Sequence, residues 1–224
     1  MTLLLIRHGE TDWNREPARC QGWADVPLND TGRRQAREQG AALRERALLG
    51  GTANSGQDPD RGSGAGCGHG AIDLIVSSHL LRASETAEII RQELGGGVPL
   101  TFDPRLAETN RGRWETRAFA EITASEPQVW RAYREHPESF RFPGGESLAE
   151  QQLRVLAALR DAARRAATAL LVTHGGSIRL ARCFLEGTGI YAFHEVATTN
   201  GSVFSITDVE VGRIAAYLHG RESV

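Results

Sequence analysis

The sequence has few cysteines and no long apolar run. Its three cysteines, Cys20, Cys67 and Cys183, are an odd number, and no two of them have CxxC or zinc-type spacing. This usage is typical of a reducing compartment, where thiols are structural or incidental. The first apolar run, residues 3–6, ends after four residues at Arg7, which is too short for a signal peptide or a membrane span. We therefore expect a cytoplasmic protein with no membrane partner.

Neither sign of charge is in large excess. The chain has 26 Lys and Arg residues against 28 Asp and Glu residues, a formal net charge of −2. No global positive field is available to recruit nucleic acid, so we expect no nucleic-acid partner. An anionic substrate would have to be attracted by a local cluster of arginines. The length of 224 residues suits a single domain, residues 1–224, with a substantial core.

Several well-known site motifs are missing. The chain is rich in glycine, yet it contains neither GxxxxGK[ST] nor GxGxxG, the loops that cradle nucleotide phosphates. HExxH spacing is also absent, and Arg7 beside His8 would repel a cation, so we predict no metal and no cofactor. No cysteine begins a Cys-x5-Arg loop, which argues against a cysteine phosphatase. The residues six positions after the three cysteines are Val26, Asp73 and Gly189.

Three short apolar runs predict buried strands, at residues 3–6, 72–76 and 169–173. Each run leads into a polar or Gly-rich turn and then into a helical pattern. Repeated strand–helix units of this kind favour a mostly parallel sheet. Helices are predicted at residues 31–48, at 80–94 and after the capping box Ser147-Leu148-Ala149-Glu150. We therefore predict an α/β fold, a three-layer α/β/α sandwich with the site at the carboxyl ends of the strands.

Two other segments have distinct patterns. Residues 203–207 and 214–218 flank Gly212, which predicts a β-hairpin. Residues 50–70 hold eight of the 25 glycines and almost no bulky apolar side chain. Such a segment cannot bury enough surface to offset the entropy of ordering it, so we predict a flexible surface insertion there.

The sharpest signal in the chain is Arg7-His8-Gly9-Glu10-Thr11, at the end of the first predicted strand. Further elements follow it in a fixed order. They are Asn14, Gln21-Gly22-Trp23, Pro27-Leu28, Gly32-Arg33, Ser77-Ser78 with Leu81-Arg82-Ala83, Glu108 with Gly112 and Trp114-Glu115, Pro143-Gly144-Gly145-Glu146-Ser147, and Val172-Thr173-His174-Gly175-Gly176. In order and approximate spacing these elements resemble the histidine phosphatase superfamily, also called the phosphoglycerate mutase-like family. The resemblance spans nearly the whole chain.

The resemblance implies catalytic roles for five residues. His8 would be the nucleophile and become a phosphohistidine, since a neutral imidazole has a free lone pair near pH 7. Arg7 and Arg82 would grip the oxygens of the transferring phosphoryl group, whose transition state spreads charge over them. His174 would donate a further hydrogen bond. Glu108 would protonate the leaving alkoxide and then take a proton from water.

The same resemblance implies that the substrate contacts Asn14, Gln21, Gly22 and Gly175. We expect the substrate to be a small soluble phosphate ester. The sequence leaves open whether the chain forms a homodimer. Hydrolysis is the favoured activity, because only residues 115–142 lie between the Trp-Glu element and Pro143. Phosphoglycerate mutases share a longer segment between these two elements. The alternatives are such a mutase and a non-catalytic phospholigand-binding regulatory module on the same fold.

Residues 113–142 are predicted to form a cap over the site. They contain Trp130, Tyr133, Phe140 and Phe142, of which we expect one or two to touch the leaving group. Some nearby residues depart from the family pattern. Arg111 and Arg113 stand where Phe and an acid are common, His79 where an acid is common, Ala107 where Arg is frequent, and Thr116 where Gly is frequent. Arg111, Arg113 and Arg117 are either surface charges or partners for a second anionic group on the substrate.

Overall fold

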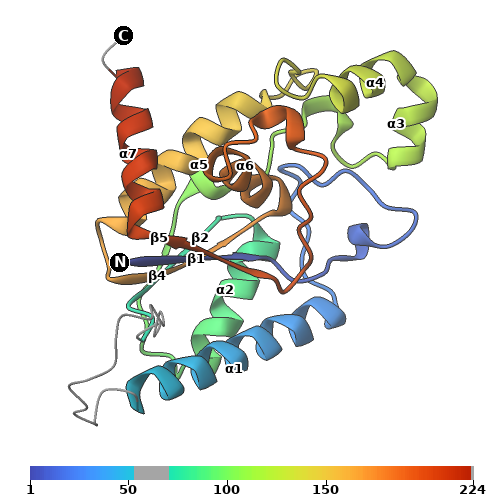
Figure 1. The fold of residues 1–224 in the computed structure, drawn as a ribbon. Helices are drawn as coiled ribbons and strands as arrows, with labels where there is room; N and C mark the ends of the chain where they lie inside the picture. Colours follow the sequence, from blue (N-terminus) through green and yellow to red (C-terminus); the bar gives the residue numbers. More distant parts are fainter. Residues whose placement is uncertain (53–70, 223–224) are drawn as a thin grey trace.

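The computed structural model describes residues 1–52 and 71–222, which are built around one five-stranded sheet (Figure 1). The strands are β1 (Thr2–Arg7), β2 (Leu74–Ser77), β3 (Leu100–Phe102), β4 (Thr168–Thr173) and β5 (Val203–Thr207), in the order β3-β2-β4-β1-β5. The first four strands run parallel, and β5 pairs antiparallel with β1. The predicted α/β fold with a mostly parallel sheet is confirmed.

Helices cover both faces of this sheet. The α-helices are α1 (Asp30–Thr52), α2 (Leu81–Glu93), α3 (Phe119–Ser125), α4 (Pro127–Glu135), α5 (Leu148–Ala163), α6 (Gly175–Leu185) and α7 (Asp208–Glu222). Short 3₁₀ helices are η1 (Asp12–Asn14), η2 (Pro104–Leu106), η3 (Gly112–Trp114) and η4 (Ile190–Ala192). Figure 1 shows α1 and α2 on one side of the sheet and α5, α6 and α7 on the other. The three predicted layers are therefore present.

The alternation of side chains along β1 explains why the sheet has helices on both faces. Leu3 and Leu5 pack in one core with apolar residues of α5, α6 and α7. Leu4 and Ile6 point the other way, into a second core with α1 and α2. Successive residues of a strand face opposite sides of a sheet, so an uninterrupted apolar run needs cover on both sides. The run at residues 3–6 is therefore a central strand.

The helix after Ser147 begins as its sequence predicts. The Ser147 hydroxyl accepts from the backbone N–H of Glu150 at 3.2 Å, and the Glu150 carboxylate accepts from the backbone N–H of Ser147 at 2.9 Å. This reciprocal pair satisfies two of the donors that a helix start leaves without a partner. The capping box thereby sets where α5 begins, and α5 packs against β1 and β4.

The predicted hairpin at residues 203–218 is wrong in its second half. Residues 203–207 are a strand, β5, but its partner is β1, and residues 214–218 belong to α7. The apolar side chains of Val211, Ile214 and Leu218 recur at helical spacing and pack on the core beside α5. Gly212 is an interior residue of this helix. A glycine is a weak turn signal when the apolar residues around it have the helical period.

The Gly-rich segment at residues 50–70, predicted to be a flexible insertion, falls mostly outside the described residues. Only residues 50–52 are described, as the end of α1. None of the helices in residues 1–52 and 71–222 has the length and apolarity needed to cross a bilayer.

Residues 113–142, the predicted cap, include η3, α3 and α4. Their aromatic rings pack on each other around the fully buried Trp114, whose ring centroid lies 5.7 Å from that of Trp130 and 5.4 Å from that of Phe142. Tyr133 and Phe140 belong to the same cluster. The structure thus uses these rings as a small core of their own, beside the main sheet.

Candidate active site

The predicted site residues gather at the carboxyl ends of three neighbouring strands. Arg7 ends β1 and His8 follows it, His174 follows β4, and Arg82 lies in the first turn of α2 after β2. A cavity of about 170 Å³ opens there. Eight of the nine predicted residues line it: Arg7, His8, Asn14, Gln21, Gly22, Arg82, Glu108 and Gly175. The ninth, His174, is fully buried, with its ring centroid 5.1 Å from that of His8.

His8 is held as a neutral imidazole. Its Nδ1 lies 2.7 Å from the carbonyl oxygen of Gly9, which only accepts hydrogen bonds. Nδ1 must therefore carry the proton, and the lone pair is on Nε2. Burial, and then the positive charges of Arg82 and Arg7, lower the pKa of His8 to about 3. The ring thus stays uncharged at neutral pH, with a lone pair on Nε2.

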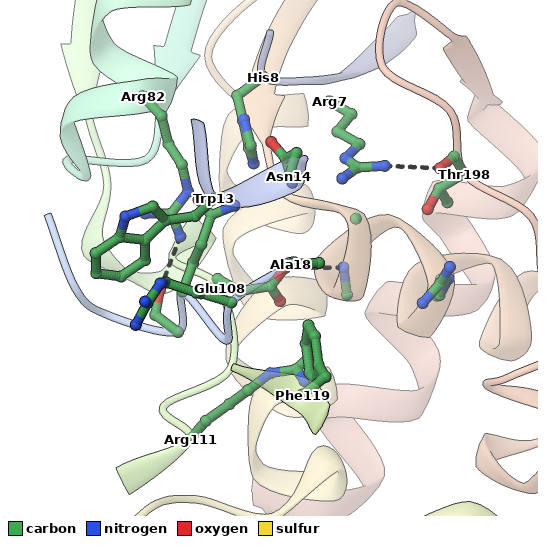
Figure 2. Close-up of a pocket in the computed structure, with 16 residues that line it drawn as sticks. Arg7, His8, Trp13, Asn14, Ala18, Arg82, Glu108, Arg111, Phe119 and Thr198 are labelled. Carbon is green, nitrogen blue, oxygen red and sulfur yellow. Dashed lines mark hydrogen bonds between the residues drawn. The ribbon is translucent and has the colours of Figure 1, made fainter. Parts of the chain in front are cut away.

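Arg7 and Arg82 present fixed guanidinium groups near His8 (Figure 2). Arg7 Nη1 donates to the carbonyl oxygen of Thr198 at 2.9 Å. Arg82 donates to two carbonyl oxygens, from Nη1 to Ala24 at 2.9 Å and from Nη2 to Gly22 at 2.7 Å. The Nε atoms of both arginines are buried and have no acceptor among the described residues. A buried donor without an acceptor is costly, so a phosphoryl oxygen placed there would be strongly favoured.

One ring nitrogen of His174 has a hydrogen-bond partner among the described residues, and the other has none. Its Nε2 lies 2.8 Å from Ser78 Oγ, which also accepts from the backbone N–H of Leu80 at 3.3 Å. A Ser78 hydroxyl that donates to Nε2 would leave the proton of a neutral imidazole on Nδ1. His174 Nδ1 is buried and has no partner among the described residues. Burial, and then the charge of Arg82, hold the pKa of His174 well below its ordinary value.

Glu108 is a carboxylate held by hydrogen bonds. Its Oε1 accepts from the backbone N–H of Thr109 at 2.9 Å, and its Oε2 accepts from that of Gly176 at 3.2 Å. Burial alone would raise the pKa of Glu108, but the charge of Arg111 and these donors outweigh it and bring the pKa to about 2. Glu108 is therefore ionised at neutral pH, and a nearby anion would raise its pKa.

The sequence did not single out every residue of the cavity wall. Trp13, Phe119, Arg179 and Thr198 also line it, together with Ala18, Arg19, Arg111 and Gly176. Phe119 is the aromatic side chain that the 113–142 segment supplies to the cavity. The sequence predicts one or two of Trp130, Tyr133, Phe140 and Phe142 there, but none of the four lines the cavity, and all lie in the cluster around Trp114. Arg179 is on a helix and Thr198 on an irregular loop. Neither position has a local motif that sets it apart from a solvated surface residue.

The structure separates the three arginines that follow Glu108. Arg113 and Arg117 both form ion pairs with Glu126, at 2.9 Å and 2.6 Å, and neither lines the cavity. Arg111 does line it. For Arg113 and Arg117 the interpretation as surface charges fits the structure. Within the part of the chain that the structure describes, no group of three or more His, Cys, Asp or Glu side chains is arranged to hold a metal ion.

Comparison with known proteins points to one family. The sequence profile of the histidine phosphatase superfamily (branch 1) matches residues 3–49 and 64–216. A curated relative named probable phosphoglycerate mutase GpmB, from Enterobacter sp. (strain 638), is 34% identical over 208 residues, which cover 92% of this chain and 84% of the relative.

Solved structures give a consistent result. Mycobacterial glucosyl-3-phosphoglycerate phosphatase in complex with VO3 is 27% identical, with a TM-score of 0.73 over 92% of both chains. YhfR from Bacillus stearothermophilus is 31% identical, with a TM-score of 0.71 over 92% of this chain and 90% of that one. One of the relatives is thus named as a mutase and one of the structures as a phosphatase.

Proposed function

This chain belongs to the histidine phosphatase superfamily, and from that premise we propose that it is a phosphatase that hydrolyses small soluble phosphate monoesters through a phosphohistidine. The observation that best supports the proposal is the environment of the His8 side chain. A neutral imidazole lies beside two guanidinium groups that have buried, unused donors, and a carboxylate lines the same cavity. These are the groups that metal-independent phosphoryl transfer needs.

In the first step, the Nε2 lone pair of His8 attacks phosphorus and the bond from phosphorus to the leaving oxygen breaks. Arg7 and Arg82 hold the phosphoryl oxygens as their charge spreads in the transition state. The leaving oxygen takes a proton from Glu108. A bound phosphoryl dianion would raise the pKa of Glu108, and a monoanionic ester would bring the proton with it.

In the second step, water attacks phosphorus and the P–N bond breaks, which returns the electron pair to Nε2 of His8. Glu108, now a carboxylate, takes the proton from that water. Inorganic phosphate leaves, and both residues are in their starting states. His174 would stabilise the phosphoryl group through its free Nδ1–H, and Asn14 through its neutral side-chain amide.

Within the superfamily the second candidate is a phosphoglycerate mutase, which the name of the curated relative favours. A mutase must keep water away from the phosphohistidine until the phosphoryl group returns to a substrate. The short 115–142 segment and the similarity to a mycobacterial phosphatase support hydrolysis instead.

The test is turnover of a generic aryl phosphate with EDTA present. We expect the wild-type protein to release phosphate and His8→Ala to lose at least about a thousandfold in kcat, because no other side chain can accept the phosphoryl group. His136→Ala is the matched control, since His136 is exposed, and it should keep wild-type activity. A trapped phosphoenzyme should be acid-labile and base-stable.

Two outcomes would count against the proposal. Substantial turnover by a folded His8→Ala protein would remove the nucleophile assignment. Conversion of 3-phosphoglycerate into its 2-isomer much faster than phosphate release would identify the protein as a mutase. Both readouts use the same protein preparation, so the two candidates are separated directly.

A further inference from the structure

The cavity holds more positive charge than one phosphoryl group needs. Five arginines line it, and Glu108 is the single carboxylate among its lining residues: the arginines are Arg7, Arg19, Arg82, Arg111 and Arg179. A phosphate monoester brings about −1.5 to −2 charges at neutral pH. Arg7 and Arg82, near His8, already balance that. The remaining arginines are available to a second anionic group.

Arg111 is fixed where it lines the cavity. Its guanidinium carbon lies 5.8 Å from the ring centroid of Tyr133 and 5.3 Å from that of Phe142. Stacking on aromatic faces holds a guanidinium group in place while leaving its edge free for hydrogen bonds. The neighbouring Cys20 thiol stays neutral, because burial raises the pKa of Cys20. Among the described residues no carboxylate forms an ion pair with Arg111.

Arg111 acts at the Glu108 side of the cavity. In the view of Figure 2 Glu108 is drawn between His8 and Arg111, and Phe119 lines the same cavity. The charge of Arg111 is the strongest of those that lower the pKa of Glu108. A group bound by Arg111 would therefore lie across Glu108 from the phosphoryl site, on the side of the leaving group.

Arg179 is held in a similar way from a different element. On α6, its Nε donates to the carbonyl oxygen of Val196 at 2.8 Å, and its guanidinium carbon lies 5.6 Å from the ring centroid of Phe193. Its two Nη atoms have no acceptor within the described residues. Arg19 is the weaker candidate, because it is exposed and donates to the carbonyl oxygen of Thr116.

We propose that Arg111 and Arg179 form a second anion subsite, so that the preferred substrate is a small phosphate monoester whose leaving group carries a carboxylate or a second phosphate. The inference rests on the proposed phosphatase activity and names its substrate class. Two guanidinium groups of fixed orientation match the planar geometry of a carboxylate and the tetrahedral oxygens of a phosphate. An uncharged sugar or alcohol would leave both charges without a counter-ion.

The test compares substrates that differ in one group. 3-Phosphoglycerate and glycerol 3-phosphate differ only in a carboxylate against a hydroxymethyl group. Propane-1,3-diol bisphosphate and its monophosphate differ only in the second phosphate. We measure kcat/KM for each in the wild-type protein, and Kd by calorimetry in the His8→Ala protein, which binds without turnover. The member that carries the second anionic group should be favoured by about ten- to a hundredfold in at least one pair. The pair that shows the larger preference identifies the second anion.

The variants are Arg111→Met, Arg179→Gln and the control Arg113→Met. Met keeps the aliphatic volume of Arg111 against the aromatic rings, and Gln keeps one donor for Val196. Both should lower the preference for the charged leaving group to near unity. Because the charge of Arg111 also lowers the pKa of Glu108, Arg111→Met should change aryl phosphate turnover as well, so the preference is taken as a ratio of kcat/KM values within each variant. Arg113 pairs with Glu126 away from the cavity, so Arg113→Met should keep the preference. Melting curves and far-UV circular dichroism check that each variant is folded.

The outcomes separate the two proposals. Absence of any preference in the wild-type and His8→Ala proteins, or its survival in both folded cavity variants, would overturn the anion subsite even if aryl phosphate is hydrolysed normally. A lack of all hydrolysis would overturn the phosphatase proposal, whereas the Kd comparison between His8→Ala and His8→Ala/Arg111→Met would still decide the subsite.

Discussion

At the scale of single residues, the site depends on groups that hold the reacting side chains in one protonation state. The Gly9 carbonyl directs the proton of His8 to Nδ1, and burial, followed by nearby guanidinium groups, opposes a second proton. For Glu108 the charged form is favoured instead, because backbone N–H groups donate to its carboxylate. Acid–base chemistry at a single pH requires environments that move the pKa values of two titratable groups apart.

Gln151 is a positioning residue behind Glu108. It is fully buried on α5, and its Nε2 donates to Glu108 Oε1 at 3.3 Å and to Ser177 Oγ at 3.1 Å. Its Oε1 accepts a short hydrogen bond from the hydroxyl of Thr109. The sequence gives no local signal for this role, because Gln151 stands in an ordinary amphipathic pattern.

Replacing Gln151 by Leu should change the pH dependence of catalysis. The variant removes a donor to the ionised form of Glu108, so the pKa of Glu108 should rise, and the limb of the kcat/KM profile that reports Glu108 should move to higher pH. We expect kcat to fall by about tenfold as the carboxylate loses its orientation. The measurement is a full pH–rate profile with an aryl phosphate.

The neighbouring residue provides a matched control for that experiment. Gln152 is also buried, and its Nε2 donates to the carbonyl oxygen of Leu180 at 2.9 Å, away from Glu108. Gln152→Leu should lower stability by a similar amount and leave the profile unchanged. An unshifted profile in Gln151→Leu, or the same shift in both variants, would show that Gln151 has only a structural role.

At the scale of elements, α7 and the turn before β5 show that glycine occurs both inside a helix and in a turn. Gly212 lies inside this helix, and a Cβ added there would meet nothing within 4 Å. Gly201, in the turn before β5, has φ +87°, a conformation that favours glycine. The same residue type is thus a turn requirement at one position and a helix weakness at the other.

Substituting Gly212 by Ala should stabilise the protein. Alanine loses less backbone entropy in a helix than glycine, so we expect the free energy of unfolding to rise by about 0.5–1 kcal/mol. Urea titration at neutral pH measures the change. Gly201→Ala is the opposing control and should destabilise, because alanine is strained at positive φ. A loss of stability in Gly212→Ala would mean that residue 212 is in a turn after all.

The elements that the sequence predicts well are those whose burial is decided locally. The run at residues 3–6 is apolar throughout, and the capping box at Ser147 satisfies its own helix start, so neither needs distant information. Arg111, Arg113 and Arg117 look alike in sequence, and only the position of Glu126 decides that two of them are paired on the surface. Arg179 and Gln151 join the site through contacts between elements far apart in the chain, which no spacing rule reveals.

At the scale of the whole molecule, charge is balanced overall and concentrated locally. The formal net charge is −2, and the sequence contains no lysine, so every basic side chain is an arginine. Five of these arginines line one cavity. The expectation that an anionic substrate would be attracted by a local arginine cluster agrees with this arrangement. Burial first, and then this concentration of positive charge, favours the neutral forms of His8 and His174 inside the fold.

The protein should lose stability in mild acid because of these two histidines. Burial first, and then nearby arginines, lower the pKa of His8 to about 3 and hold that of His174 well below 6.5, the ordinary value that applies in the unfolded chain. Below pH 6.5 the unfolded chain therefore binds more protons than the folded one, and stability falls as pH falls. The contribution is complete above pH 6.5 and is lost progressively toward the folded pKa values.

Between pH 6.5 and 5 the histidines dominate this dependence, since unfolded carboxyl groups titrate below the window, near pH 4. Burial also lowers the pKa of His194, so the share of His8 is taken from a comparison of variants. Each histidine should contribute a slope approaching about 1.4 kcal/mol per pH unit to the free energy of unfolding in the lower part of that window. Urea unfolding at several pH values measures the slope in wild type, in His8→Ala and in His136→Ala. Removing His8 should reduce the slope by up to about 1.4 kcal/mol per pH unit, the contribution of one proton. Removing the exposed His136 should leave the slope unchanged. Equal slopes in all three proteins would mean that His8 takes up a proton in the folded state as readily as in the unfolded chain, and its role as a neutral nucleophile would then be lost below pH 6.5.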